Sequence, residues 1–194
     1  MSDAKPAPPR IHITGASGCG VSTLGAALAV RLGATHLDTD DFYWLPTDPP
    51  YRQSRAIAER LRLVRQAFDA ADGGWVLSGS LDGWGDPLIP RFERVVFLDA
   101  PTAVRLSRLA ARERERYGAA IEPGGPLADQ HRDFMAFAAA YDDGRFTGAL
   151  QGRHRARHEA WLVALPCPVQ RLDATEPTES LVAAVLSRRA AQAG

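Results

Sequence analysis

The stretch Gly15-Ala-Ser-Gly-Cys-Gly-Val-Ser-Thr23 decides the fold. It follows a short apolar run, Ile11 to Thr14, that is typical of a buried strand. It leads into Ser22 to Leu32, where leucines recur at helical spacing. A glycine-rich turn between a strand and a helix can wrap its backbone N–H groups around an anion, and the helix adds the positive end of its dipole. The sequence therefore predicts a phosphate-binding loop; the alternative is a glycine-rich turn that binds nothing.

One residue departs from the usual spacing of such a loop, G-x-x-x-x-G-K-[ST], because Val21 stands where a lysine is expected. That lysine normally places a positive charge beside the β- and γ-phosphates. The only lysine of the chain is Lys5, which lies in its proline-rich start. A compensating charge must therefore come from arginine, from a metal ion or from another molecule.

The rest of the loop has the groups that Mg-ATP needs. Ser22 occupies the position where a hydroxyl coordinates Mg²⁺ between the β- and γ-phosphates. We expect the loop to hold ATP mainly through its backbone N–H groups. The candidate ATP-binding residues are Gly15, Ser17, Gly18, Cys19, Gly20, Val21, Ser22 and Thr23.

A cluster of carboxylates follows the second predicted strand, Thr35 to Leu37. In an open parallel sheet, the ligand crevice lies outside the carboxyl ends of the strands. The cluster consists of Asp38, Asp40 and Asp41. One carboxylate there can orient an acceptor hydroxyl and take its proton, and a second can hold Mg²⁺ directly or through water. The aromatic run Phe42 to Trp44 could form one wall of an acceptor pocket. The alternative is an acidic turn that caps the next element.

The predicted helix after Pro101 carries a stripe of arginines at spacings of three and four residues: Arg105, Arg108, Arg112 and Arg116. The helix runs into a break at Pro123 to Pro126, so its end could close over phosphates as a lid. Guanidinium groups suit bidentate contact with phosphate oxygens. The alternative is a solvated face on which Glu113 and Glu115 pair with the arginines, and we expect one or two arginines to reach the nucleotide. A second, weaker candidate set is Arg153, Arg155 and Arg157.

The remaining chain alternates predicted strands and helices without an internal repeat. Further strands are predicted at Trp75 to Ser78, Val95 to Asp99 and Pro168 to Leu172. Further helices are predicted at Arg52 to Ala71, from Pro101 onward, and at Leu127 to Tyr141, Gly152 to Leu165 and Pro177 to Arg189. Such alternation predicts an α/β domain with a mainly parallel sheet. We expect residues 1–9 to be a flexible tail and residues 10–194 to form one domain.

Composition narrows the class of protein. The 194 residues include 23 Lys plus Arg and 23 Asp plus Glu, so the formal net charge is zero, which argues against a nucleic-acid-coating protein. The two cysteines, Cys19 and Cys167, lie far apart, as expected for free thiols in a reducing cytosol. The start lacks the apolar run of a signal peptide. We expect a cytoplasmic monomer or homodimer without nucleic-acid or membrane partners.

These residues together resemble small P-loop kinases of the adenylate kinase-like superfamily. Gly15 to Thr23 matches their phosphate loop apart from Val21. Asp38-Thr39-Asp40 looks like the D-x-D after the second strand of shikimate kinases. Asp40-Asp41-Phe42-Tyr43 looks like the D-[DS]-F-[YF] of uridine and nicotinamide riboside kinases, in which the first aspartate is implied to be the catalytic base. The resemblance thus implies that role for Asp40.

The resemblance extends over nearly the whole chain. Trp75 to Gly79 resembles the Walker B strand, although Ser78 stands where some members carry an acid. Leu172 to Thr175 resembles the last strand and the loop that border the adenine. The arginines that resemble those of the lid are Arg108, Arg112, Arg114 and Arg116. The chain also resembles a lysine-lacking subgroup of uncharacterised P-loop proteins.

The resemblance implies a doubly wound P-loop fold with a five-stranded parallel sheet in the order 2-3-1-4-5 and an arginine-rich lid at about residues 112–127. The expected activity is transfer of the γ-phosphate of Mg-ATP to a small acceptor: a nucleoside, a nucleotide or another small hydroxyl metabolite. Asp40 would act as the base, Ser22 and Asp38 would hold Mg²⁺, and Arg108, Arg112 and Arg116 would offset the transferred charge. The alternative is a nucleotide-binding regulatory or adaptor protein with little or no kinase activity.

Overall fold

The computed structural model describes residues 7–146 and 152–193. In this part of the chain, five strands form one sheet in the order β2-β3-β1-β4-β5, and every neighbouring pair is parallel. The strands are β1 (Arg10–Gly15), β2 (Thr35–Asp38), β3 (Trp75–Ser78), β4 (Arg94–Asp99) and β5 (Val169–Asp173). The predicted α/β class and sheet order are confirmed.

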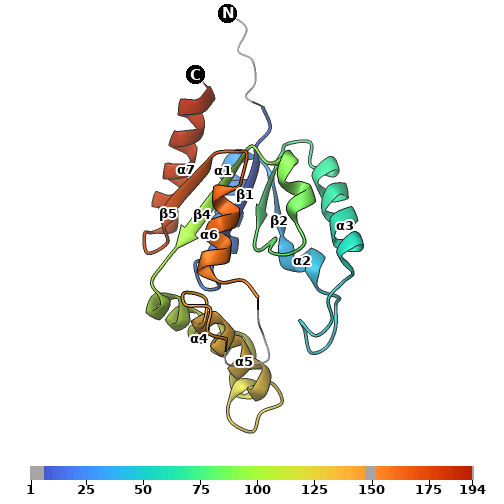
Figure 1. Ribbon diagram of the computed structural model, residues 1–194, viewed down its shortest axis with the longest axis vertical. Coiled ribbons are helices and arrows are strands. Elements are labelled where there is room, and N and C mark those ends of the chain that lie inside the picture. Colours follow the sequence, from blue (N-terminus) through green and yellow to red (C-terminus); the bar gives the residue numbers. More distant parts are fainter. Residues whose placement is uncertain (1–6, 147–151, 194) are drawn as a thin grey trace, which may run out of the picture.

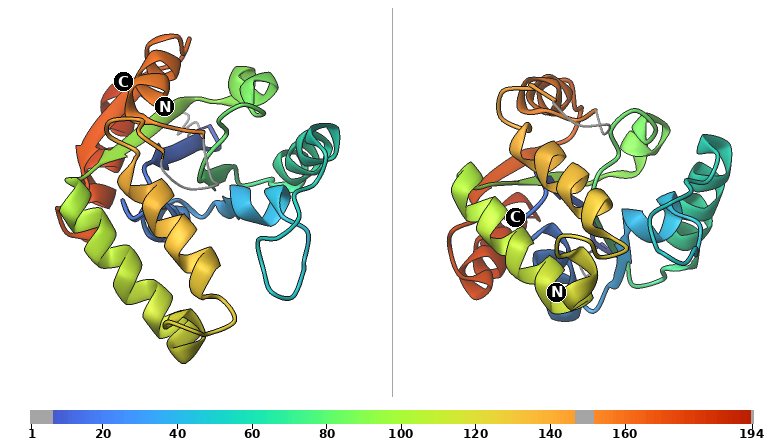
Figure 2. Two further views of the ribbon diagram at one scale, coloured as in Figure 1. Left: turned by 60° about the horizontal axis from the view of Figure 1, so that its bottom comes forward. Right: turned by 90° about the horizontal axis from the view of Figure 1, so that it is seen from below.

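Helices cover both faces of the sheet (Figures 1 and 2). The α-helices are α1 (Val21–Leu32), α2 (Thr39–Tyr43), α3 (Ile57–Ala70), α4 (Thr102–Tyr117), α5 (Ala128–Ala139), α6 (Arg155–Val163) and α7 (Thr178–Ala193), and short 3₁₀ turns are η1 (Asp86–Arg91) and η2 (Gly118–Ile121). Strand β4 shows how the two layers arise. Val96 and Leu98 pack with α1 and α7, whereas Val95 and Phe97 pack with α3 and α6. This burial on both faces explains the continuous apolar run that predicted the strand.

Helices α4 and α5 form a hairpin beyond the carboxyl ends of the strands, at the bottom of Figure 1, whereas the end of α7 lies at the opposite end of the molecule. The predicted lid, residues 112–127, corresponds to the last turns of α4, to η2 and to the turn before α5. The hairpin therefore stands next to the edge where the ligand crevice of an open parallel sheet lies.

Two segments differ from the predicted elements for local reasons. The expected polar loop after β2 is the short helix α2, because the Asp38 carboxylate accepts a hydrogen bond from the Asp40 N–H and caps the helix, 3.0 Å. Helix α3 begins at Ile57 rather than near residue 52. The preceding residues are extended instead, since the Arg55 N–H donates to the Tyr43 carbonyl, 2.8 Å.

The chain is tied to the sheet just before β1, at Pro9. The Trp75 N–H donates to the Pro9 carbonyl, 2.7 Å, so the last residues of the expected tail run alongside β3. Residues 1–6 of that tail lie outside the described part of the chain. None of the described helices is both long enough and apolar enough to cross a lipid bilayer.

Candidate functional site

The glycine-rich loop joins β1 to α1 at the carboxyl edge of the sheet. Gly18 and Gly20 have φ angles of 88° and 81°, in the left-handed region that glycine adopts without strain. A Cβ atom on Gly18 would lie 2.5 Å from the Arg105 carbonyl oxygen, so α4 packs directly on the loop. No side chain caps the first turn of α1, which leaves its N–H groups available to an anion.

Ser22 joins this loop to the carboxylates after β2. Its hydroxyl donates to Asp38 Oδ2 at 2.5 Å, and Asp38 Oδ1 accepts from the Asp40 N–H at 3.0 Å. One carboxylate thus spans the distance between the first turn of α1 and the first turn of α2. The structure brings together three of the predicted site residues in this way.

Asp40 is an exposed residue of the first turn of α2, and its carboxyl lies near that of Asp38. Desolvation of this carboxyl raises its pKa above the ordinary value of 3.8, and the nearby Asp38 charge raises it further. The charge of Arg153 acts in the opposite direction. Asp41, the next residue, has its pKa raised by desolvation and by the Asp38 charge as well, so the direction of the shift is shared by both carboxyls.

The last residue of β3 is Ser78, at the position where some P-loop kinases carry an acidic residue. Ser78 is fully buried, and its hydroxyl donates to the Val21 carbonyl at 3.3 Å and lies 3.0 Å from His36 Nε2. Ser78 therefore secures the start of α1. Any metal ion bound here depends on the loop and on the carboxylates after β2.

Aromatic side chains gather beside α2, where one wall of an acceptor pocket was expected. The rings of Tyr43 and Trp44 lie 4.6 Å apart, and Trp84 lies 6.3 Å from Tyr43. The guanidinium of Arg60 lies 3.6 Å above the Tyr43 ring and is buried. Sequence reasoning missed Arg60, because an arginine in an amphipathic helix looks like a residue of the solvent face.

The arginine stripe of α4 does not act as one surface. Arg105 has no exposed area, pairs with Asp142 at 2.9 Å, and donates to the carbonyls of Ser17 at 3.4 Å and Ala138 at 3.1 Å. It therefore braces the loop against α5. No signal in the spacing separates Arg105 from the other three.

The outer arginines of the stripe each have a neighbour in the protein. Arg108 donates to the Ala174 carbonyl at 2.9 Å, beside the turn that follows β5. Arg112 pairs with Glu113 at 2.8 Å, as the alternative interpretation had it. Arg116 donates to the Tyr51 hydroxyl at 3.2 Å, and nearby Gln130 donates to the Pro50 carbonyl at 3.2 Å. The role of Arg108, Arg112 and Arg116 over a nucleotide stays a prediction.

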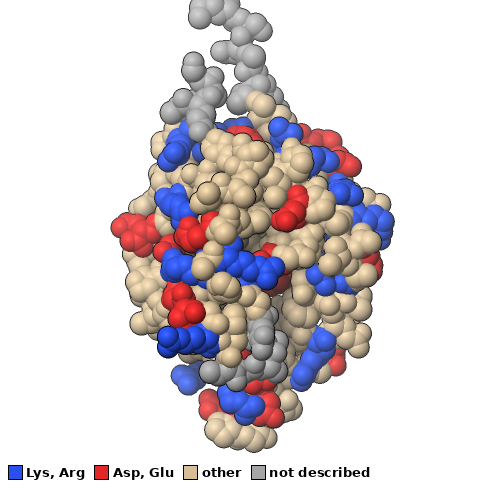
Figure 3. Space-filling view, viewed as in Figure 1, with Lys and Arg blue, Asp and Glu red and all other residues tan. Residues whose placement is uncertain are grey.

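The second arginine set lies at the start of α6. Arg155 pairs with Asp99 and Asp142, both at 2.8 Å, and Arg157 pairs with Asp82 at 2.7 Å. In the face shown in Figure 3, basic and acidic side chains are interspersed, and they meet in a hollow near its centre. This mixture of signs agrees with the zero net charge.

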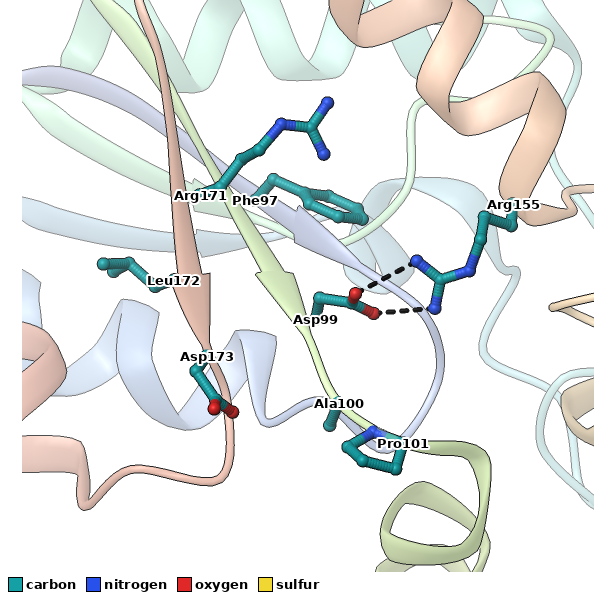
Figure 4. Close-up of a pocket in the computed structure, with 8 residues that line it drawn as sticks. All are labelled: Phe97, Asp99, Ala100, Pro101, Arg155, Arg171, Leu172 and Asp173. Carbon is teal, nitrogen blue, oxygen red and sulfur yellow. Dashed lines mark hydrogen bonds and ion pairs between the residues drawn. The ribbon is translucent and has the colours of Figure 1, made fainter.

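A cavity of about 470 Å³ lies at the carboxyl ends of β4 and β5 (Figure 4). Arg155 reaches from α6 to Asp99 at one side, and the Phe97 ring lies between Arg155 and Arg171. Arg171 is itself paired with Glu159. None of the residues of the phosphate loop, Gly15 to Thr23, lines this cavity.

The donor set decides which metal the site could take. Among residues 7–146 and 152–193, no group of three or more His, Cys, Asp or Glu side chains is placed to hold a metal ion. Mg²⁺ that is bound largely by phosphates and water needs only one or two oxygen ligands from the protein. Ser22 and Asp38 supply such oxygens. The pair therefore fits Mg²⁺ that arrives with a nucleotide.

Comparisons with known proteins match this geometry. A family model described as "AAA domain" matches residues 11–123. The uncharacterized protein YqaC of Bacillus subtilis (strain 168) is 44% identical over 163 residues, which cover 84% of this chain and 87% of that protein. A shikimate kinase structure from Bacteroides thetaiotaomicron superposes with a TM-score of 0.55 at 15% identity, over 92% of this chain and 97% of that one. A gluconokinase structure from Sinorhizobium meliloti 1021 gives 0.51 at 16% identity, over 97% and 95%. At such identities the structural likeness shows the fold alone.

Proposed function

The chain belongs to the AAA-domain family and has the fold of small P-loop kinases, and on this premise we propose that it transfers the γ-phosphate of Mg-ATP to a small acceptor. The acceptor is a nucleoside, a nucleotide or another small metabolite, and a hydroxyl acceptor is favoured. Asp40 provides a general base, which a hydroxyl acceptor uses and a phosphate acceptor does not need.

The hydrogen bond between Ser22 and Asp38, 2.5 Å, is the observation that carries this proposal. It places a hydroxyl and a carboxylate side by side at the mouth of an anion-binding loop, with the candidate base attached to the same carboxylate through its N–H. A glycine-rich turn that binds nothing does not require a hydroxyl beside a carboxylate. An acidic turn that only caps α2 uses Oδ1 of Asp38, whereas here Oδ2 also accepts from Ser22.

Each part of the site then has one task. The N–H groups of the loop and of the first turn of α1 hold the phosphates. Mg²⁺ bound at Ser22 and Asp38 neutralises charge on the phosphate oxygens. Asp40 orients the acceptor hydroxyl and takes its proton, and the aromatic residues beside α2 enclose the acceptor.

The nucleotide base is proposed to lie over the turn that follows β5. Arg108 donates to the Ala174 carbonyl there at 2.9 Å, so it holds α4 against this turn. Residues 112–127 are proposed to act as a lid, with Arg108, Arg112 and Arg116 offsetting the transferred charge. The domain is proposed to comprise residues 10–194.

A second function, nucleotide binding without phosphoryl transfer, is favoured by two observations. Val21 removes the loop lysine, and Ser78 supplies a hydroxyl at the end of β3 where an acid could assist the metal. Such a protein would act as a regulator or adaptor that responds to ATP. Asp40 argues for the transferase, because its N–H contacts the Asp38 carboxylate that accepts from Ser22.

The experiment compares Asp40→Asn with Asp41→Asn, a matched control on the next residue. Single-turnover transfer from labelled Mg-ATP to pools of candidate acceptors is measured, together with ATP affinity by equilibrium binding. Asp40→Asn should lower the transfer rate by about 10²–10⁴-fold with ATP affinity nearly unchanged, because a general base contributes that much. Asp41→Asn should transfer within a few-fold of the parent protein.

Two results would change the conclusion. If the parent protein binds Mg-ATP but no pool yields ADP, the regulatory function takes first place. If Asp40→Asn transfers at the parental rate, the base lies elsewhere, and Asp38→Asn is the next variant to measure.

A further inference from the structure

Arg153 is the one arginine of the second set that has no carboxylate partner among the described residues. Arg155 pairs with Asp99 at 2.8 Å, and Arg157 pairs with Asp82 at 2.7 Å. Within the described part of the chain, Arg153 forms no ion pair, and its buried Nε has no hydrogen-bond partner. Buried donors in native proteins are nearly always satisfied, so an unpaired one requires an explanation.

Arg153 lies where several segments of the chain converge. Its charge acts on groups of β1, the phosphate loop, α2, the turn after β3, the end of α5 and α6: His12, Cys19, Asp40, Asp82, Tyr141 and His158. Cys19 belongs to the phosphate loop and Asp40 is the candidate base. The Arg153 guanidinium therefore lies within electrostatic range of both the loop and Asp40, although these are far from it in sequence.

The surroundings of Arg153 disfavour its charge. Burial lowers the pKa of the guanidinium, and Asp40 and Asp82 lie too far away to form an ion pair with it. Asp82 is already occupied by Arg157. A half-buried guanidinium whose Nε is unpaired carries a desolvation cost that a bound anion would offset. The loop shows the complementary deficit, because Val21 leaves it without the cation that such loops carry.

We propose that Arg153 binds an oxyanion in the crevice between the phosphate loop and Asp40, and so supplies the positive charge that Val21 leaves out. A planar guanidinium can make two parallel hydrogen bonds to such a group. The oxyanion is either the γ-phosphate of the nucleotide or an acidic group of the acceptor. This inference rests on the proposed phosphoryl transfer, and it shifts the compensating charge from the α4 stripe to the segment before α6.

The test uses the full chain with Mg-ADP bound and inorganic phosphate as the added oxyanion. Phosphate affinity is measured from the rise in unfolding temperature, in the parent protein, in Arg153→Gln, in Arg153→Lys and in the control Arg171→Gln. Arg171 is an exposed arginine of β5 that pairs with Glu159. We expect Arg153→Gln to weaken phosphate binding by about 10–100-fold, as for the loss of a charged hydrogen bond, Arg153→Lys to recover part of it, and the control to match the parent.

A second measurement identifies the source of the oxyanion. If it is the γ-phosphate, the ratio of Mg-ATP to Mg-ADP affinity falls by a similar factor in Arg153→Gln. If that ratio is unchanged while phosphate binding is lost, the oxyanion belongs to the acceptor. In the absence of ligands, Arg153→Gln should unfold at or above the parental temperature, since it removes a half-buried charge that has no ion-pair partner among the described residues; this separates a lost contact from a misfolded protein.

Two results would overturn the inference: phosphate stabilisation that persists in Arg153→Gln, or its absence from a parent protein that binds Mg-ADP. A parent protein that binds neither nucleotide would instead refute the proposed function itself. The two failures are therefore distinguishable in the same set of measurements.

Discussion

Replacing Arg105 by methionine should be one of the most destabilising changes in the molecule. Methionine keeps most of the length of the side chain and removes its charge and all its donors. Arg105 is completely buried, pairs with Asp142 at 2.9 Å, and donates to the carbonyls of Ser17 and Ala138. The change therefore removes contacts to the phosphate loop and to the α4–α5 hairpin together.

The size of the loss in unfolding free energy depends on which groups Arg105→Met leaves unpaired. Removing one partner of a buried ion pair costs about 3–5 kcal/mol. Asp142 retains Arg155 at 2.8 Å, so it does not become an isolated charge, and the loss should lie near 3 kcal/mol. For a chain of this size, that corresponds to a fall in unfolding temperature of about 6–12 °C.

The assay is urea unfolding followed by tryptophan fluorescence, with Arg132→Gln as the matched control. Arg132 pairs with Asp129 at 2.8 Å on the exposed face of α5, and such pairs contribute about 0–1 kcal/mol. Arg105→Met should also weaken ATP binding, because Ser17 and Gly18 rest on α4. If Arg105→Met lowers the free energy of unfolding by less than about 1 kcal/mol, or by no more than the control does, Arg105 does not hold the phosphate loop against α5.

Three further expectations concern the site. Gly18→Asp should abolish ATP binding in equilibrium titrations, since the new side chain meets the Arg105 backbone and adds negative charge to the anion cradle; unchanged affinity in a folded variant would contradict the loop assignment. Desolvation and the Asp38 charge raise the pKa of Asp40, so on acidification this carboxylate becomes protonated at a higher pH than an ordinary aspartate does. A kcat–pH profile should therefore show kcat declining as the pH falls through the raised pKa of Asp40. Val21→Lys should change the parental transfer rate by less than about tenfold, yet raise the rate of an Arg153→Gln background, because one cation in the crevice is needed and not two; no rescue in the double variant would speak against that balance.

The fold could be predicted because its determinants are local or periodic. The apolar run of β4 reflects burial on both sheet faces, and the glycines of the loop reflect backbone angles that other residues rarely adopt. The resemblance to small P-loop kinases is confirmed at the level of the fold. The sequence also predicts Ser22 and Asp38 at one edge of the sheet, because Ser22 belongs to the phosphate-loop motif and Asp38 follows the next strand.

The arginines could not be sorted in the same way. Helical spacing places Arg105 and Arg108 near one face, but only the packing of α5 and the loop shows that one is buried and the other lies beside Ala174. Arg153 belongs to an irregular segment, where no periodicity indicates a direction. Which residues converge from distant segments is a property of the assembled chain.

The hydrogen bonds of Arg116 to Tyr51 and of Gln130 to Pro50 join two segments that lie far apart in the sequence. They fasten the α4–α5 hairpin, which packs on the phosphate loop, to the segment that follows α2 and its carboxylates. Bonds in such exposed or half-buried places contribute about 0.5–1.5 kcal/mol each. Thermal motion can break two such bonds without unfolding α4 or α5, so the contact between the hairpin and this segment can open and re-form while the rest of the fold stays intact.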